Sequence, residues 1–476
     1  MSELHGPAAD ATAIRSAAID AVRPAALVAA RLRLGGAGLE FDGHGMTPPL
    51  DPRAAGRIVV VGGGKAAAEM AAAVETLLLG AGVDPTRLSG LVSVPAGCGR
   101  RLRCIEVRET RPAGFNLPTP AAVAATREML ALIGGLGPAD LAIALITGGG
   151  SALVAAPRAG VPLEEKIAVA KFLAAAGADI RGLNTVRQAV SDVKAGGLAR
   201  ACAAGRLVAL VLSDVIGDPL ELIASGPCMP VTPRPDEALA VLERHGAIAA
   251  GVAPRLVARL RDDVTAAGIE RAASGSAWTT PRGCRVEHVL LGSNATAVEA
   301  AAAAARRAGY EAIVRHAAAA MHETADEVGR RLAAEGFELA VRASREGRPL
   351  AIVEGGEAVV VLPADHGRGG RNQQTALMAL AAVQAAGREW PRGLLLASVG
   401  TDGEDGPTDA AGGVMDAEIA AAVARQGADV GRAVARCAAH DVLAAAGGLI
   451  VTGPTGTNVA DVRFVLARPG VRRARS

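Results

Sequence analysis

The chain has 476 residues, which is more than one ordinary domain needs and predicts two or three domains. Half of its residues are hydrophobic but only 2% are aromatic, which excludes a platform of exposed rings for single-stranded nucleic acid. A net charge of +2, from 50 basic and 48 acidic residues, excludes a global field for binding polyanions. The six cysteines form no CxxC motif and are expected as free thiols. Because we find neither a signal peptide nor an apolar run long enough to span a bilayer, we expect a cytoplasmic protein.

The first half of the chain alternates apolar strands with helical segments. A helix is expected over residues 11–34. Strands are then expected at 57–61, 88–94, 141–146 and 207–212, with helices at 65–79, 121–132 and 164–176. This alternation predicts βαβ units and a mostly parallel sheet, which binds ligands at the carboxyl ends of its strands.

The second half follows a looser, arginine-rich helical stretch at 235–272 and a polar link at 274–283. Strands are expected at 286–291, 394–399, 449–451 and 463–466, helices at 295–308 and 373–386, and a hairpin of 350–353 with 358–362. The hairpin would turn at the glycine pair 355–356. We therefore place one α/β domain at 10–275 and a second at 284–470.

Four glycine-rich loops, at 62–64, 148–150, 292–294 and 453–456, each follow an apolar strand. Glycine lets the backbone approach a ligand, and a following helix offers unpaired N–H groups to an anion. Any strand-to-helix turn can carry a glycine, so one such loop alone does not specify phosphate. The candidate binding residues in these loops are Gly63, Gly64, Gly149, Gly150, Ser151, Ser293 and Asn294.

Lys65 strengthens the case for the first loop, because a cation at a helix start opposes the helix dipole and suggests an anionic ligand. The loop is not a P-loop. The spacing Gly62-x-Gly64-x-x-Ala67 matches a loose dinucleotide fingerprint, but the next strand ends without the required acidic residue. Lys65 is therefore a candidate for contact with phosphate rather than with NAD.

The segment 184–197, NTVRQAVSDVKAGG, predicts a helix. Thr185 and Gln188 would form a capping box at its start, and a glycine pair would end it. Arg187, Ser191 and Lys194 would then share one face. That face is either a solvated basic stripe or a clamp for a carboxylate or phosphate.

Charged residues also follow or precede other predicted elements. Asp214 comes directly after a buried strand, where a carboxylate can hold a metal, accept a proton or merely cap a turn. Asp218, before a proline, better suits a turn cap. Arg368 and Arg371 lie in a glycine-rich loop before a helix and are either simply exposed or suited to grip phosphate with two guanidinium groups.

The stretch 398–416, SVGTDGEDGPTDAAGGVMD, places Asp402, Glu404, Asp405 and Asp409 within eight positions after an apolar strand. Such crowding increases the electrostatic repulsion between the carboxylates, which a cation or a basic side chain would relieve. The alternative is a solvated acidic turn.

Seven segments, taken together and in order, carry a family resemblance: GGGKAAAEM, LITGGGSALV, NTVRQAVSDVKAGG, LSDVIGDPLELIASGP, GRGGRNQQTAL, GTDGEDGPTDAAGG and VTGPTGTNVAD. From about residue 10 to 466 the chain resembles the type II glycerate kinases, also called the glycerate 2-kinase or MOFRL family. The resemblance implies a larger Rossmann-like domain with a parallel sheet and a smaller α/β domain with a mixed sheet. It places the active site in the cleft between them.

The implied reaction transfers the γ-phosphoryl group of ATP to D-glycerate with Mg²⁺. Of the candidates above, Lys65, Asp214 and Arg371, together with Asn458, match motif positions expected at the site. Lys65 and Arg371 would neutralise the phosphoryl group. Arg187 and Lys194 would bind the substrate carboxylate. Asp214 would act as a base or as a metal ligand, and Asp402 and Asp409 would be further metal ligands. Expected partners are ATP and a small sugar acid, not nucleic acid or membrane, with a monomeric or homodimeric state.

One segment departs from the family pattern. Where a Gly-His-Pro-x-Pro-Asp-Glu string is usual, residues 110–116 read TRPAGFN, so Arg111 replaces the histidine and acidic pair. A Met321-His322-Glu323 string also replaces a small Gly-Glu-Ala-like segment. A related sugar acid such as a tetronate is therefore an alternative substrate. A dinucleotide-dependent hydroxypyruvate reductase and a catalytically silent sugar-acid-binding regulator are the alternative functions.

Overall fold

The computed structural model describes residues 7–36, 38–46, 48–266, 277–318 and 323–469. It divides into two compact units. The N-terminal unit comprises Pro24–Ser213 and Asp218–Leu291. The C-terminal unit comprises Met1–Arg23, Asp214–Gly217 and Gly292–Ser476. The N-terminal helix and the short segment carrying Asp214 therefore belong with the second half of the chain.

The N-terminal unit is built on a seven-stranded sheet in the order β6-β5-β4-β7-β8-β10-β9. Its strands are β4 (Ile58–Gly63), β5 (Leu88–Pro95), β6 (Ile105–Arg111), β7 (Leu141–Thr147), β8 (Arg206–Leu212), β9 (Ala277–Thr279) and β10 (Arg285–Gly292). The strands from β6 to β8 pair in parallel, and β9 is antiparallel to β10. Strands β4 and β7 are buried at every position, as central strands covered on both faces should be. The predicted Rossmann-like parallel sheet is confirmed.

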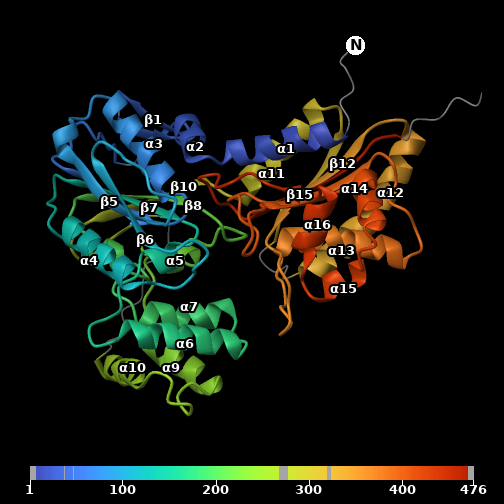
Figure 1. The fold of residues 1–476 in the computed structure, drawn as a ribbon. Coiled ribbons are helices and arrows are strands. Elements are labelled where there is room, and N and C mark those ends of the chain that lie inside the picture. The colour runs from blue at the N-terminus through green and yellow to red at the C-terminus, as the bar shows by residue number, and fades with distance from the viewer. Residues whose placement is uncertain (1–6, 37, 47, 267–276, 319–322, 470–476) are drawn as a thin grey trace, which may run out of the picture. The chain divides into compact units, whose positions relative to one another are not determined.

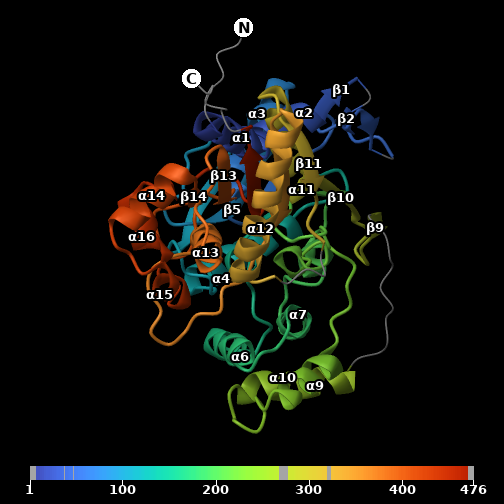
Figure 2. The ribbon, with the colours of Figure 1, turned by 90° about the vertical axis from the view of Figure 1, so that its right-hand side faces the viewer.

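The helices of this unit form two groups (Figures 1 and 2). Helices α3 and α4 pack on the sheet, whereas α6, α7, α9 and α10 pack on one another around a separate apolar cluster. The helices are α2 (Pro24–Arg31), α3 (Ala67–Gly80), α4 (Pro120–Gly134), α5 (Gly150–Leu153), α6 (Leu163–Ala175), α7 (Ile180–Ala189), α8 (Gly197–Ala201), α9 (Pro235–Arg244) and α10 (Pro254–Ala266). Short 3₁₀ turns lie at η1 (Pro85–Arg87) and η2 (Ile223–Ser225), and an antiparallel sheet joins β1 (Leu32–Gly35), β2 (Gly38–Phe41) and β3 (His44–Gly45).

The C-terminal unit contains a six-stranded sheet in the order β11-β12-β16-β13-β14-β15. Its strands are β11 (Glu311–Arg315), β12 (Leu350–Gly356), β13 (Leu394–Gly400), β14 (Gly412–Met415), β15 (Leu449–Ile450) and β16 (Asp461–Ala467). Strands β11 and β12 are parallel and the other pairs are antiparallel, so the predicted mixed sheet is confirmed. Leu350 and Ile352 alternate along β12 and pack with residues of α12 and α13 in the core of the unit.

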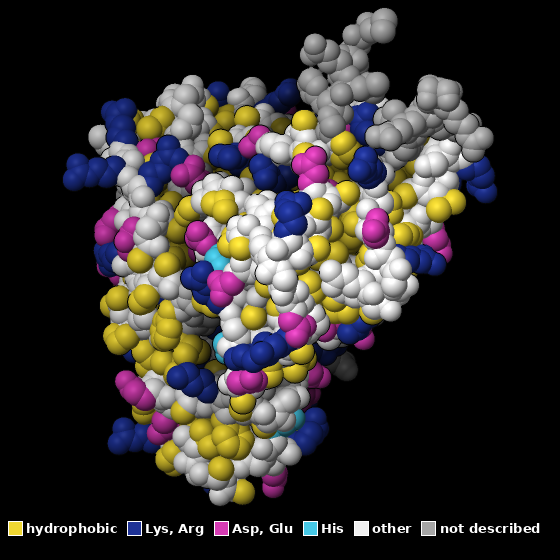
Figure 3. Space-filling view, turned by 45° about the vertical axis from the view of Figure 1, so that its right-hand side comes forward, with side chains coloured by type: hydrophobic (Ala, Val, Ile, Leu, Met, Phe, Trp, Pro, Cys, Tyr) yellow, Lys and Arg dark blue, Asp and Glu magenta, His cyan; other side chains and the backbone are white. Residues whose placement is uncertain are grey.

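The helices of the C-terminal unit are α1 (Pro7–Ala21), α11 (Asn294–Arg307), α12 (Ala325–Glu346), α13 (Arg371–Ala385), α14 (Ala417–Arg425), α15 (Val430–Ala435) and α16 (Ala439–Ala446). Helices α12 and α13 pack side by side, and α1 lies against α11 (Figure 1). Basic and acidic side chains intermingle on the surface shown in Figure 3, in keeping with the small net charge. Across the described residues, no helix is both long and apolar enough to cross a membrane.

The expected helix at 11–34 and the expected hairpin at 350–362 are wrong. The helix predicted at 11–34 is interrupted, because Pro24 has no N–H for a continuing helix and instead begins α2. The hairpin predicted around the glycine pair 355–356 does not form. Strand β12 runs through Gly356 and pairs with β11 and β16, and residues 358–362 contribute only a single bridge between Val359 and Thr324.

Two expectations fall partly outside the described residues. The end of the helical stretch predicted at 235–272 and the start of the link at 274–283 lie there. Met321 and His322 of the altered second segment also lie outside the described residues.

Candidate active site

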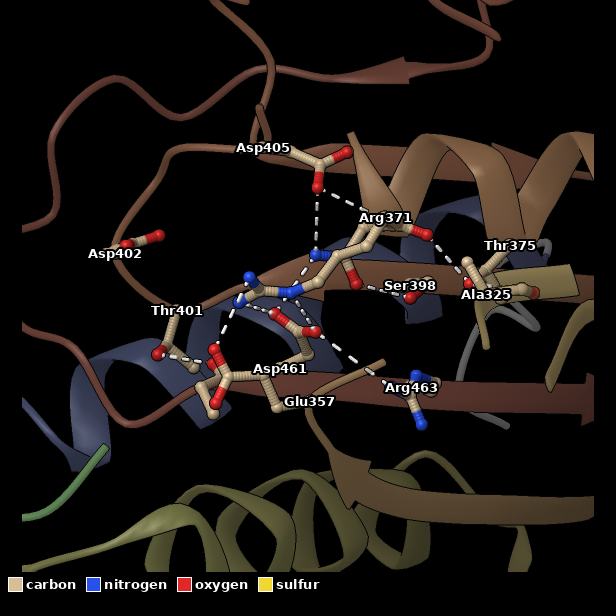
Figure 4. A network of polar contacts seen from close by, with 12 residues as sticks. Ala325, Glu357, Arg371, Thr375, Ser398, Thr401, Asp402, Asp405, Asp461 and Arg463 are labelled. Carbon is tan, nitrogen blue, oxygen red and sulfur yellow. Dashed lines mark hydrogen bonds and ion pairs between the residues drawn. The ribbon is translucent and has the colours of Figure 1, made fainter. Parts of the chain in front are cut away.

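Arg371 is the centre of the candidate site in the C-terminal unit. It begins α13, and its guanidinium holds the carboxylate of Asp461, the first residue of β16, in a bidentate grip (Figure 4). The Nε–Oδ2 distance is 2.7 Å and the Nη2–Oδ1 distance is 2.9 Å. Asp461 is 0% exposed and the Arg371 side chain is 30% exposed. This charge-assisted pair fixes the guanidinium plane, while Nη1 lies 3.5 Å from Oε1 of Glu357.

Glu357 follows β12 and stands among several carboxylates. Removal from water raises its pKa to about 7. The positive charge of Arg371 lowers this pKa, whereas the nearby carboxylates of Asp461, Asp214 and Asp402 raise it. The side chain remains 47% exposed, so a ligand can reach it. The group carries more negative than positive charge, which is the condition that a divalent cation relieves.

Asp405 belongs to the scaffold of this site. Its carboxylate accepts hydrogen bonds from the backbone N–H groups of Asn372 (3.0 Å) and Gln373 (2.8 Å), and so caps the start of α13. Burial raises the pKa of Asp405 to about 6, while these N–H groups act in the opposite direction. A Cβ atom on Gly370 would lie 2.3 Å from Asp405, so glycine is required there. The acidic loop thereby holds Arg371 at the helix start.

The other predicted residues of this loop region differ in their surroundings. Asp402 Oδ1 accepts from the N–H of Glu404 (3.1 Å), and Asp402 is one of the carboxylates that influence Glu357. Asp409 is 80% exposed and lies 3.6 Å from Nε2 of His440. Arg368 is 58% exposed and pairs with Asp441 at 3.2 Å. The structure therefore places Asp214 and Asp402 near Glu357, which lies against Arg371, and gives Asp409 and Arg368 other partners.

Ser293, Asn294 and Asn458 surround the beginning of β16. Ser293 caps α11 through a capping box, and the Asn294 amide donates to the carbonyls of Val459 and Asp461, both at 2.9 Å. Asn458 accepts from the N–H of Ala460 at 3.3 Å. The Asn294 side chain thus holds the backbone that carries Asp461.

Across the described residues, no set of three His, Cys, Asp or Glu side chains is arranged to bind a metal ion by itself. Mg²⁺ is usually held by one or two carboxylates together with waters and substrate phosphates. Asp214 and Asp402, with hard oxygen ligands in a region of surplus negative charge, fit that mode of binding.

In the N-terminal unit, the first two glycine-rich loops lie side by side at the carboxyl ends of β4 and β7. Gly64 has φ of 144°, and a Cβ there would approach Thr147 to 2.2 Å. The N–H of Lys65 donates to Gly148 at 2.8 Å. A Cβ on Gly149 would lie 3.7 Å from Lys65 Cγ and 3.6 Å from Arg111 Nη2. The altered 110–116 segment thus brings Arg111 beside the second loop.

The helix predicted at 184–197 is wrong in its bounds. Helix α7 begins at Ile180 after the cap Asp179, whose carboxylate accepts from Gly182, and it ends at Ala189. Asp179 supplies the start signal that the Thr185–Gln188 pair was expected to give. Ser191 and Lys194 therefore lie beyond the helix and do not share a helical face with Arg187.

Lys194 is only 1% exposed and donates from Nζ to the carbonyls of Ser151 (3.1 Å) and Ala224 (3.2 Å). Ser151 also lies within hydrogen-bond distance of Ser225, at 3.1 Å between the hydroxyls. Ala224 and Ser225 have φ of 50° and 63°, a conformation that costs energy for non-glycine residues and tends to occur at functional sites. The η2 turn is thus fastened to the second glycine loop through Lys194.

The sequence prediction missed a third cation in this region, Lys166 of α6. Lys166 is 7% exposed and its Nζ has no hydrogen-bond partner among the described residues. Burial and the neighbouring Arg187 lower its pKa to about 8, and Asp192 opposes this. Burial, Lys166 and Arg187 also lower the pKa of Lys194 well below its usual value. Such a cluster is costly unless an anion binds it.

The sequence prediction also missed two candidate residues of the C-terminal unit, Glu357 and Asp461. Each had a signal in the sequence: Glu357 follows a buried strand, as Asp214 does, and Asp461 closes the VTGPTGTNVAD motif. The expected hairpin turn concealed the first. The pairing of Asp461 with Arg371, 90 positions away, is a tertiary contact that no local pattern indicates.

Comparison with known proteins agrees with this organisation. A profile described as "Domain of unknown function (DUF4147)" matches residues 10–261, and the MOFRL family profile matches residues 350–461. The chain is 36% identical to human glycerate kinase, over 87% of this chain and 84% of the relative. It is also 36% identical to a protein of Agrobacterium vitis named "putative hydroxypyruvate reductase", over 86% of this chain and 99% of the relative.

A crystal structure of glycerate kinase from Thermotoga maritima superposes with a TM-score of 0.75 and 32% identity, over 96% of this chain and 99% of that one. Both domain profiles, the identity to curated relatives and the shared fold extend over most of the chain. The chain therefore belongs to the MOFRL-type glycerate kinase family, a family of kinases.

Proposed function

We propose that this protein uses ATP and Mg²⁺ to phosphorylate D-glycerate, or a closely related sugar acid, to its 2-phosphate. The observation that carries the proposal is the arginine held rigidly by buried Asp461 beside accessible carboxylates. Phosphoryl transfer needs little covalent chemistry from the protein and depends on positioning and charge stabilisation. A fixed guanidinium meets that requirement.

Asp214 and Asp402 are the proposed Mg²⁺ ligands, because both add to the negative charge around Glu357. The ion, when bound, would neutralise charge on the nucleotide phosphates. Arg371 would stabilise the transferring phosphoryl group through Nη1, which Asp461 does not occupy. Asp409 remains a predicted ligand without support from its surroundings.

In the N-terminal unit, Arg187 and Lys194 are the proposed partners of the substrate carboxylate, with Lys166 adding to the positive field. Lys65 is the proposed contact for phosphoryl oxygens, and its position next to the Gly149 loop supports this role. Arg111, close to the same loop, is the residue most suited to alter the preference among sugar acids.

The test incubates purified protein with ATP, Mg²⁺ and a panel of sugar acids and measures ADP, with the phosphorylated position assigned by ³¹P NMR. A chelator should abolish turnover, and added Mg²⁺ or Mn²⁺ should restore it. Asp214→Asn should lose far more turnover than the nearby control Asp218→Asn. NADH oxidation with hydroxypyruvate, without any ADP formation, would instead establish the reductase alternative.

A further inference from the structure

A pocket of about 330 Å³ lies within the C-terminal unit, next to Glu357. It opens where β12 ends at Gly356, and the apolar part of its wall includes Ile216, Val328 and Ala358. Its volume is at the lower end of the range for small-molecule sites. The pocket is therefore large enough for part of a substrate or cofactor.

Arg463 in the wall of this pocket has unused hydrogen-bonding capacity. It is 3% exposed, and its Nε and Nη2 atoms have no hydrogen-bond partner among the described residues. The nearest carboxylate oxygens, of Glu354 and Asp461, lie 3.5 and 3.9 Å away. Buried donors left unsatisfied are expensive and are normally satisfied by a ligand or water.

Both neighbouring carboxylates already have closer partners. Glu354 is held by Arg331 through two contacts of 3.0 Å, and Asp461 is held by Arg371 (Figure 4). A Cβ on Gly356 would lie 2.7 Å from Arg463 Nη1, so the glycine is what allows the guanidinium to occupy this position. The geometry thus keeps a buried donor available at the pocket wall.

The charges that line the pocket indicate what kind of group it accepts. Three arginines (315, 331 and 463) face three glutamates (323, 354 and 357), and His316 also lines the pocket, so positive and negative side chains nearly balance there. A phosphate or carboxylate would gain little electrostatic attraction. An uncharged group with an apolar ring and hydroxyl acceptors matches both the apolar wall and the unused donors of Arg463.

We propose that this pocket binds the nucleoside half of the phosphoryl donor, an inference that rests on the proposed kinase function. Glu357 borders the pocket and also lies against Arg371. A nucleoside seated in the pocket would therefore direct its phosphates toward the arginine proposed to contact them. Arg463 donates to hydroxyl or ring acceptors of the nucleoside.

The test fills the pocket by enlarging a side chain in its wall. The residue chosen belongs neither to the hydrophobic core nor to the proposed catalytic groups. Ala317 lines the pocket and is half-buried, so Ala317→Phe occupies the space whereas Ala317→Ser is the matched control. Calorimetry measures binding of ATP and of inorganic tripolyphosphate to each full-length variant. We expect Ala317→Phe to weaken ATP binding at least tenfold, about 1.4 kcal/mol, with tripolyphosphate binding unchanged.

Three outcomes would overturn the proposal. They are unchanged ATP affinity in a folded Ala317→Phe protein, equal losses for ATP and tripolyphosphate, and a higher KM for the sugar acid alone. Thermal melting of both variants verifies the fold, and Arg463→Met, with the same expected loss for ATP only, provides a second test. If no sugar acid yields ADP but Ala317→Phe still weakens binding of ATP and not of tripolyphosphate, the proposed function fails and the pocket assignment stands.

Discussion

Replacing Arg371 with alanine tests whether the pair with Asp461 is both a structural and a catalytic element. In this variant the carboxylate of Asp461, which is 0% exposed, loses its main positively charged partner. Breaking a buried pair from one side costs about 3–5 kcal/mol, and we expect about 3 kcal/mol because the Arg371 side chain is itself 30% exposed. For a unit of this size, that corresponds to a fall in Tm of about 6–12 °C.

The assay combines thermal and urea unfolding with a double-mutant cycle. Asp461→Asn in the Arg371→Ala background removes the stranded charge, so the double variant should recover about 1 kcal/mol or more relative to Arg371→Ala alone. Steady-state kinetics below the melting transition should show kcat reduced by about a hundred- to thousand-fold with a smaller change in KM. Arg371→Lys should not restore activity fully, since an ammonium group cannot make the bidentate contact.

Two results would refute this reasoning. A melting temperature within about 2 °C of wild type, together with strictly additive effects in the cycle, would show that the buried pair does not stabilise the unit. A folded Arg371→Ala protein with wild-type kcat would remove Arg371 from the mechanism whatever its effect on stability.

Two further predictions concern an exposed cation, Arg368, and a buried one, Lys166. Arg368→Ala should change the unfolding free energy by less than about 1 kcal/mol and leave kcat within about twofold of wild type, because the pair of Arg368 with Asp441 is exposed. A loss of kcat approaching that of Arg371→Ala would instead place Arg368 at the phosphates. Lys166 has a folded-state pKa of about 8 against an ordinary 10.5, so between these pH values the unfolded chain binds more protons and stability rises with pH. Lys166→Met should therefore raise Tm at pH 7, by an amount equivalent to roughly 3 kcal/mol of unfolding free energy. This gain in stability should shrink toward pH 10.5. A gain in stability that is equal at both pH values would contradict the buried-charge explanation.

The sequence alone determined most of the strands and helices in order, and it indicated the loops that carry the candidate residues. Buried strands such as β4 and β7 are continuous apolar runs, and the glycine-rich turns after them are local signals. Asp214 and Arg371 could be identified as candidates because each adjoins the end or start of such an element. Lys65 was a candidate because it follows a glycine-rich loop at a helix start, and the family motifs added Asn458.

Only the tertiary structure decided which of these residues lie together. Arg371 holds Asp461, and Glu357 lies beside both, because β12, β16 and the start of α13 come together in the folded unit. It also showed that Asp405 is a helix cap and that Lys166 joins Arg187. The physical reason is that apolar periodicity and turn chemistry are properties of neighbouring residues, whereas ion pairing and burial depend on which distant strands and helices pack together.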